Sequence, residues 1–169
     1  MLPVMSLASQ PPLELVDEID LERYQGRWYE IARLPNRFQA QCEGDVTADY
    51  ALREDGRVAV TNRCRRADGS RVEAEGVARR ARPDGPAAAL EVRFAPRWLS
   101  FLPFVWGDYR VIALDDDYRH ALVGSEDRDF LWVLSRRPEL ERATLDELLA
   151  RARQQGFELE QLVMTRQSP

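Results

Sequence analysis

The sequence contains no lysine, a single histidine and only two cysteines among its 169 residues. Without lysine, the chain has neither a Schiff-base nucleophile nor a phosphate-binding loop that ends in Gly-Lys-Ser/Thr. A structural zinc site needs three or four ligands at short spacings, which His120, Cys42 and Cys64 cannot supply. The Gly-x-Gly-x-x-Gly fingerprint of dinucleotide binding is also absent. We therefore expect no cofactor and no metal.

Charge and hydrophobicity restrict the class of protein further. Against 24 basic residues, all of them arginine, stand 29 acidic residues, so the formal net charge is −5. Nucleic acid is not the expected partner, because phosphate binding favours a basic surface. No apolar run approaches the roughly 18 residues that a membrane-spanning helix needs. With 44% hydrophobic and 31% charged residues, the chain is typical of a globular domain.

The beginning of the chain differs from the rest. Residues 1–12 carry no charge and end in Pro11-Pro12. We interpret residues 1–19 as an N-terminal extension, a candidate signal remnant, and residues 20–169 as one domain. No cysteine precedes Cys42, so the chain as it stands has no lipoprotein acylation site.

After Gly26, short alternating segments are separated by turn signals about every ten residues, which is typical of an antiparallel sandwich or barrel. Asp55-Gly56 is a strong hairpin signal. A capping box at Thr144-x-x-Glu147 and a stop at Gly156 predict one helix, and 158–164 predicts a final strand. The eight strands before the helix are predicted at 28–33, 45–53, 57–64, 71–81, 87–95, 109–114, 119–123 and 130–136.

Alternation gives four consecutive strands, from 45 to 95, one apolar face and one charged face. The apolar face carries small residues at Ala48, Ala74, Gly76 and Ala78. Such side chains cannot fill the interior of an eight-stranded barrel, which holds either side chains or one small ligand. We therefore expect a cavity. His120 lies in an alternating segment, and we interpret it as a strand-face residue rather than a catalytic base.

Three motifs carry a family resemblance. The segment 26–33, Gly-Arg-Trp-Tyr-Glu-Ile-Ala-Arg, resembles the Gly-x-Trp motif of lipocalins. The segments 115–123 and 130–136 resemble the second and third lipocalin motifs, in the same order and at similar spacing. The sequences of these motifs are most similar to those of the bacterial lipocalin and apolipoprotein D branch.

The resemblance implies an all-β fold, an eight-stranded antiparallel up-and-down barrel with a C-terminal helix packed outside and a short final strand. It implies structural roles for Gly26, Trp28 and Arg136, with the last two stacked at the barrel floor. The acidic run 115–117 then becomes a solvated turn at the closed end. At the open mouth, the hairpin register brings Cys64 near Cys42, and we expect a disulfide between them, which indicates an oxidising compartment.

The implied function is binding and transport or storage of a small lipophilic ligand, a fatty acid or a lysophospholipid, linked to cell-envelope maintenance. The expected location is the periplasm or outer membrane, the oligomeric state a monomer or homodimer, and the segment 96–107 a candidate for contact with a membrane surface. The mouth loops carry Phe38, Trp98, Phe101 and Phe104. The predicted cavity residues are Ala48, Tyr50, Val60, Asn62, Ala74, Leu90, Val92, Phe94, Trp106, Tyr109 and Trp132.

Two alternatives stay open at this point. One is a lipid-modifying enzyme on the same fold, although the chain offers no obvious pairing of nucleophile and base and we expect no enzyme. The other is an interaction module whose barrel is filled by Tyr50, Phe94, Trp132 and loop aromatics.

Overall fold

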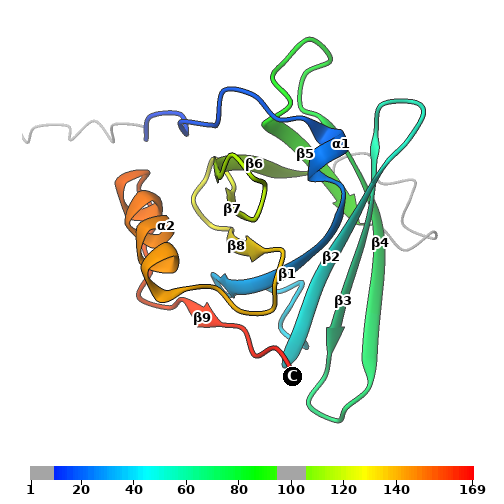
Figure 1. Cartoon of the computed structure of the whole chain (residues 1–169), viewed down its shortest axis with the longest axis vertical. Coiled ribbons are helices and arrows are strands. Elements are labelled where there is room, and N and C mark those ends of the chain that lie inside the picture. The colour runs from blue at the N-terminus through cyan, green and yellow to red at the C-terminus, as the bar shows by residue number, and fades with distance from the viewer. Residues whose placement is uncertain (1–9, 95–105) are drawn as a thin grey trace, which may run out of the picture.

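The structure, a computed structural model, describes residues 10–94 and 106–169 (Figure 1). A four-residue helix precedes eight strands, and a long helix and a two-residue strand follow them. The elements are α1 (Leu21–Tyr24), β1 (Gly26–Arg33), β2 (Gly44–Leu52), β3 (Val58–Arg65), β4 (Arg71–Arg80), β5 (Ala89–Phe94), β6 (Gly107–Leu114), β7 (His120–Gly124), β8 (Leu131–Ser135), α2 (Arg142–Gln154) and β9 (Val163–Met164).

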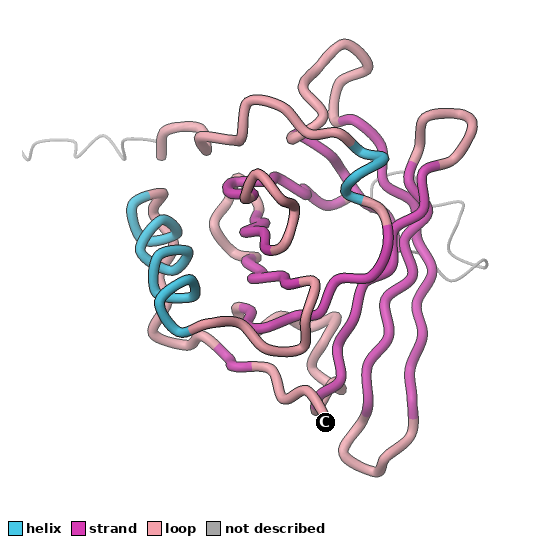
Figure 2. Tube along the Cα trace, viewed as in Figure 1, coloured by secondary structure: helices cyan, strands magenta, loops and turns pink. Residues whose placement is uncertain are grey.

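The sheet closes on itself. Each strand from β2 to β7 pairs antiparallel with the next one along the chain, and β1 pairs with both β2 and β8. The tube view shows the strands arranged as a ring (Figure 2). The predicted up-and-down barrel is confirmed, and most strand ends lie within two residues of their predicted positions.

Between β1 and β2 the barrel is closed in two ways, by direct pairing of the strands and by the C-terminal segment. The strands pair directly from Gly26 to Tyr29, and beyond that point the C-terminal segment lies between them. The Gln167 side chain donates to the carbonyl of Glu30 in β1 at 2.8 Å and to that of Val46 in β2 at 2.9 Å. Residues 163–168 therefore complete the wall where β1 and β2 diverge.

Two apolar clusters share the barrel wall. One fills the lower interior, and the other lies outside, where Leu145, Leu148 and Leu149 of α2 pack on β6, β7 and β8. Figure 1 shows α2 beside these strands, across the barrel from β2–β4. The predicted packing of the helix against the outer wall is confirmed. No helix among the described residues has the length and apolarity to cross a bilayer.

Two local predictions were wrong. The helix begins at Arg142 with Glu141 as its N-cap and no side-chain cap, so Thr144 lies inside the helix rather than capping it. The final strand has only two residues instead of the seven predicted at 158–164, because the chain before Val163 forms a turn in which the Leu162 N–H donates to the Leu159 carbonyl at 3.1 Å. The predicted stop at Gly156 is present: its φ of 93° and the Phe157 N–H bond to the Ala152 carbonyl end α2 in a Schellman motif.

Residues 11–19 run along the barrel. Leu13 is buried in the outer cluster, the Val16 N–H donates to the Val111 carbonyl at 3.1 Å, and Arg128 donates to the Pro11 carbonyl at 2.6 Å. This part of the predicted N-terminal extension packs against the domain.

Candidate functional site: the barrel lumen

The barrel floor is sealed by a tryptophan and an arginine. Trp28 has no exposed surface, and the Arg136 Cζ atom lies 4.0 Å from the centroid of its ring. Arg136 also donates to the backbone carbonyls of Arg23, Gln25 and Tyr118. The predicted stacking of Trp28 and Arg136 is thus present, and it ties α1, β1 and β8 together below the lumen.

A chain of three tyrosine hydroxyls lies above this floor. The Tyr24 and Tyr109 oxygens are 2.7 Å apart, and the Tyr109 hydroxyl donates to Tyr50 at 2.8 Å. Burial raises the pKa of all three tyrosines, that of Tyr50 to about 12, so they are neutral at physiological pH. A cavity of about 10 Å³ remains beside them, which is room for about one water molecule.

The inward face of β3 becomes more exposed from the floor to Asn62. Val58 and Val60 in β3 are buried, whereas Asn62 further along the strand is half-buried. Ala74, which pairs with Asn62 from β4, is exposed. The lower lumen is therefore packed with side chains, and the upper lumen is open along β3 and β4.

The small residue Gly76 has a specific packing partner. A Cβ atom at this position would lie 2.7 Å from Cδ1 of Phe94, the residue that pairs with it from β5. The Phe94 ring therefore uses the space that the missing side chain leaves. The small residues on β4 therefore differ in their surroundings: the Phe94 ring covers Gly76, whereas Ala74 is exposed.

Most predicted cavity residues do face the interior. Trp106 does not: the Cζ atoms of Arg79 and Arg93 lie 3.8 and 5.1 Å from its ring centroid. Arg79 pairs with Glu91 on the outer face, opposite to the inward Ala78, so Trp106 packs outside the barrel and its prediction as a cavity residue was wrong. The predicted mouth residues Trp98, Phe101 and Phe104 lie outside the described residues. Of the predicted cavity residues, five belong to the buried interior cluster: Ala48, Tyr50, Val60, Leu90 and Tyr109. Three more pack against that cluster: Val92, Phe94 and Trp132.

An aromatic row leads from the surface into the mouth. Phe38 in the β1–β2 loop is 58% exposed, and its ring stacks on Phe130 with centroids 6.2 Å apart. Phe130 in turn stacks on Trp132 at 5.8 Å. Phe38, Phe130 and Trp132 thus form one continuous row of stacked rings.

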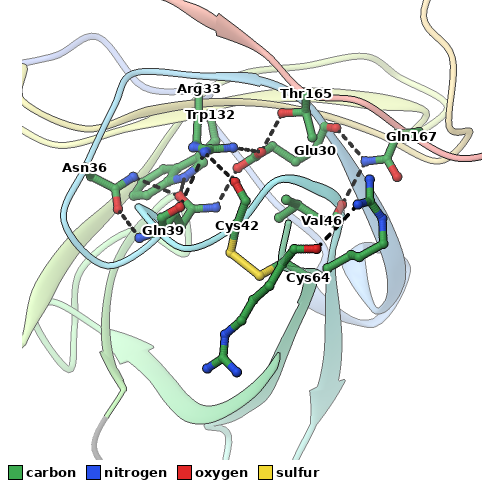
Figure 3. The surroundings of a disulfide bond; sticks show 12 residues. Glu30, Arg33, Asn36, Gln39, Cys42, Val46, Cys64, Trp132, Thr165 and Gln167 are labelled. Carbon is green, nitrogen blue, oxygen red and sulfur yellow. Dashed lines mark hydrogen bonds and ion pairs between the residues drawn. A yellow bond between two sulfur atoms is a disulfide. The ribbon is translucent and has the colours of Figure 1, made fainter. Parts of the chain in front are cut away.

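A buried polar cluster in the upper lumen was not predicted. Glu30 is 2% exposed and accepts from Arg33 Nη1 at 2.9 Å, and Gln39 reaches both Glu30 and Trp132 (Figure 3). Alternation with Trp28 could have placed Glu30 inside. Arg33 could not be placed in this way, because a bulge between Glu30 and Ala32 shifts the register of β1.

The predicted disulfide closes the loop that carries this cluster. Cys42 and Cys64 are bonded, with their Cα atoms 5.6 Å apart, and Figure 3 shows the bond beside the cluster. The backbone carbonyl of Cys42 accepts from Arg33 Nη2 at 3.5 Å. The bond thus fixes the end of the β1–β2 loop against β3.

The one histidine, the candidate catalytic base, lies away from the lumen. His120 faces outward at the closed end, with Nδ1 3.8 Å from Asp115 Oδ1, and Asp115 accepts from the backbone N–H groups of Arg119 and His120. Within residues 10–94 and 106–169, no group of three or more His, Cys, Asp or Glu side chains could hold a metal ion.

Comparison with known proteins agrees with this architecture. Residues 19–167 match the family model of the lipocalin-like domain. The chain belongs to the lipocalin family. It is 40% identical over 163 residues to temperature-induced lipocalin-1 of Arabidopsis thaliana, covering 96% of this chain and 87% of that protein. It is 43% identical over 161 residues to outer membrane lipoprotein Blc of Escherichia coli K12, covering 93% and 85%.

Solved structures show the same lipocalin barrel. Apocrustacyanin C1 superposes with a TM-score of 0.71 at 16% identity, covering 89% of this chain and 81% of that one. The predicted family and fold are confirmed, and the identity to Blc confirms the bacterial lipocalin branch. Lipocalins bind small hydrophobic ligands and are generally binding proteins rather than enzymes.

Proposed function

We propose that this lipocalin binds a fatty acid or a lysophospholipid in the upper lumen and carries or stores it in the bacterial cell envelope. The open, largely apolar stretch of β3 and β4 around Ala74 is the observation on which the proposal depends. An acyl chain buried there gains about 25 cal/mol per Å² of apolar surface removed from water. No catalytic step is part of this function.

The location in the envelope is supported by two observations. The disulfide between Cys42 and Cys64 is the kind of bond that persists in an oxidising compartment such as the periplasm. The similar protein Blc is by name an outer membrane lipoprotein.

The proposal is tested by enlarging Ala74. Ala74→Trp fills the open part of the lumen, so we expect it to abolish or shorten the binding of acyl chains with little loss of stability, because it fills empty space. The measurement is displacement of a fluorescent fatty acid by a lysophospholipid, with a thermal melt of each variant. Glu75→Gln on the exposed outer face is the matched control and should bind as the wild type does. Normal binding by a folded Ala74→Trp protein would contradict a ligand site on this wall.

A second candidate function is favoured by the packed lower lumen. With a cavity of only about 10 Å³ beside the tyrosines, the barrel could serve as a filled scaffold for an interaction surface. Native mass spectrometry of the purified protein separates the two. A bound lipid supports the carrier, whereas a bare chain that also fails to bind added lipid supports the scaffold.

A further inference from the structure

The carboxamide of Gln39 occupies the buried polar cluster in the way a ligand group would. Its oxygen accepts from Trp132 Nε1 at 2.9 Å and from Asn36 Nδ2 at 2.8 Å. Its nitrogen donates to Glu30 Oε1 at 2.8 Å. Two donors on one side and a carboxylate on the other fix the orientation of the amide. The side chain thus reaches from the β1–β2 loop into contacts with Glu30 of β1 and Trp132 of β8.

One hydrogen-bonding group of this cluster has no partner. The Arg33 side chain is only 9% exposed, and its Nε atom is buried without a hydrogen bond. The adjacent Nη2 atom makes only long bonds, 3.4 Å to the Gln39 carbonyl and 3.5 Å to that of Cys42. A buried unpaired donor costs about 1–3 kcal/mol, so this edge of the guanidinium favours an additional acceptor.

The cluster faces the lumen from the wall formed by β1 and β8. Glu30 pairs with Leu134 and Arg33 with Trp132, and both partners belong to or pack against the interior cluster. Trp132 also continues the aromatic row from Phe38 and Phe130. An acyl chain in the upper lumen would therefore have its polar end close to Glu30, Arg33 and Trp132.

We propose that Glu30, Arg33 and Trp132 form a subsite for the polar end of the ligand, and that Gln39 occupies it when no ligand is bound. The inference rests on the proposed binding of an acyl chain in the upper lumen, and the polar group that it names differs from the carboxylate of a fatty acid and the ester of a lysophospholipid. The group that fits is uncharged and has both a donor and an acceptor, as a primary carboxamide has. Its oxygen replaces that of Gln39 at Trp132, and its nitrogen replaces the donor to Glu30. A ligand that is not tied to the loop can shift its oxygen toward the free Arg33 Nε, which the Gln39 oxygen does not reach.

A carboxylate fits this position less well. Arg33 already neutralises Glu30, which also accepts from the Thr165 hydroxyl at 2.5 Å. A second carboxylate would add an unpaired negative charge in a buried site and leave Glu30 Oε1 without a donor. An ester would supply an acceptor without a donor. The subsite therefore distinguishes lipids that share one acyl chain.

The experiment compares oleamide, oleate and methyl oleate as displacers of the uncharged dye N-phenyl-1-naphthylamine. Gln39→Ala removes the competing side chain, and Gln41→Ala, an exposed residue of the same loop, is the matched control. We expect Gln39→Ala to bind oleamide about tenfold more tightly than the wild type does, with smaller changes for the other two lipids. Trp132→Phe keeps an aromatic ring but removes the N–H donor, so it should weaken the binding of oleamide selectively.

The outcomes separate this subsite from the proposed function. If all three lipids displace the dye but Gln39→Ala shifts them equally, Gln39 only holds the loop and the subsite is refuted. If Gln39→Ala does not fold, the wild type and Trp132→Phe still test the subsite. The subsite is refuted if oleamide and oleate displace the dye equally well from the wild type and if Trp132→Phe leaves both displacements unchanged. If neither the dye nor any lipid binds to the wild type or to Gln41→Ala, the proposed function itself fails.

Discussion

The disulfide should carry a large share of the stability of this lipocalin. Cys42 and Cys64 are 22 residues apart in sequence, and the bond restricts the unfolded chain. In the chain-entropy model, a loop of that length lowers the entropy of the unfolded state by about 11 cal/mol/K, or about 3 kcal/mol at 25 °C. For a domain of this size, that free energy corresponds to a melting temperature lower by about 6–12 °C when the bond is removed.

The assay is thermal and urea unfolding of the wild type and of the double variant Cys42→Ala/Cys64→Ala, each with and without a reducing agent. The reducing agent should lower the wild type to the level of the variant and leave the variant unchanged. A variant that melts within about 2 °C of the oxidised wild type would refute the reasoning, because the loop entropy alone predicts several times that shift.

Trp28→Ala should lower the free energy of unfolding by about 3–5 kcal/mol through loss of the fully buried ring, with lipid displacement retained in the folded fraction; an unchanged melting temperature with lost binding would contradict its structural role. Burial raises the pKa of Tyr50 to about 12, so its contribution to stability is complete below about pH 10 and is lost as the pH rises toward 12, because the unfolded tyrosine ionises first. Between pH 10 and 11, urea unfolding of the wild type should therefore lose up to about 1.4 kcal/mol more stability than Tyr50→Phe does, and parallel curves would refute this. Gln167→Ala removes two bonds that bridge β1 and β2 and should cost about 1–3 kcal/mol. Hydrogen exchange at Asp45, whose N–H donates to the Arg166 carbonyl, should then become faster, whereas unchanged exchange would show that the backbone alone holds this seam.

Local pattern by itself determined the strands and their two faces, and the lipocalin motifs then selected a barrel over a sandwich. The two-residue period of a strand depends only on backbone geometry, so strands and faces such as that of Val58 and Val60 could be assigned without knowing their neighbours. Turn chemistry was equally local, as Gly56 shows with its φ of 83° in the β2–β3 hairpin. The disulfide followed from the same register, because a hairpin of known turn brings defined positions together.

The contents of the lumen depended on the tertiary structure. The bulge in β1 turns Arg33 inward against the simple alternation, and Trp106, which follows no alternation, packs outside on Arg79. Gln39 reaches Glu30 and Trp132 only because the disulfide and the strands hold its loop over the mouth. Residues far apart in the chain meet at this site, and their contacts arise from the closure of the barrel. For that physical reason, periodicity along the sequence could predict the wall of this lipocalin but not the polar cluster inside it.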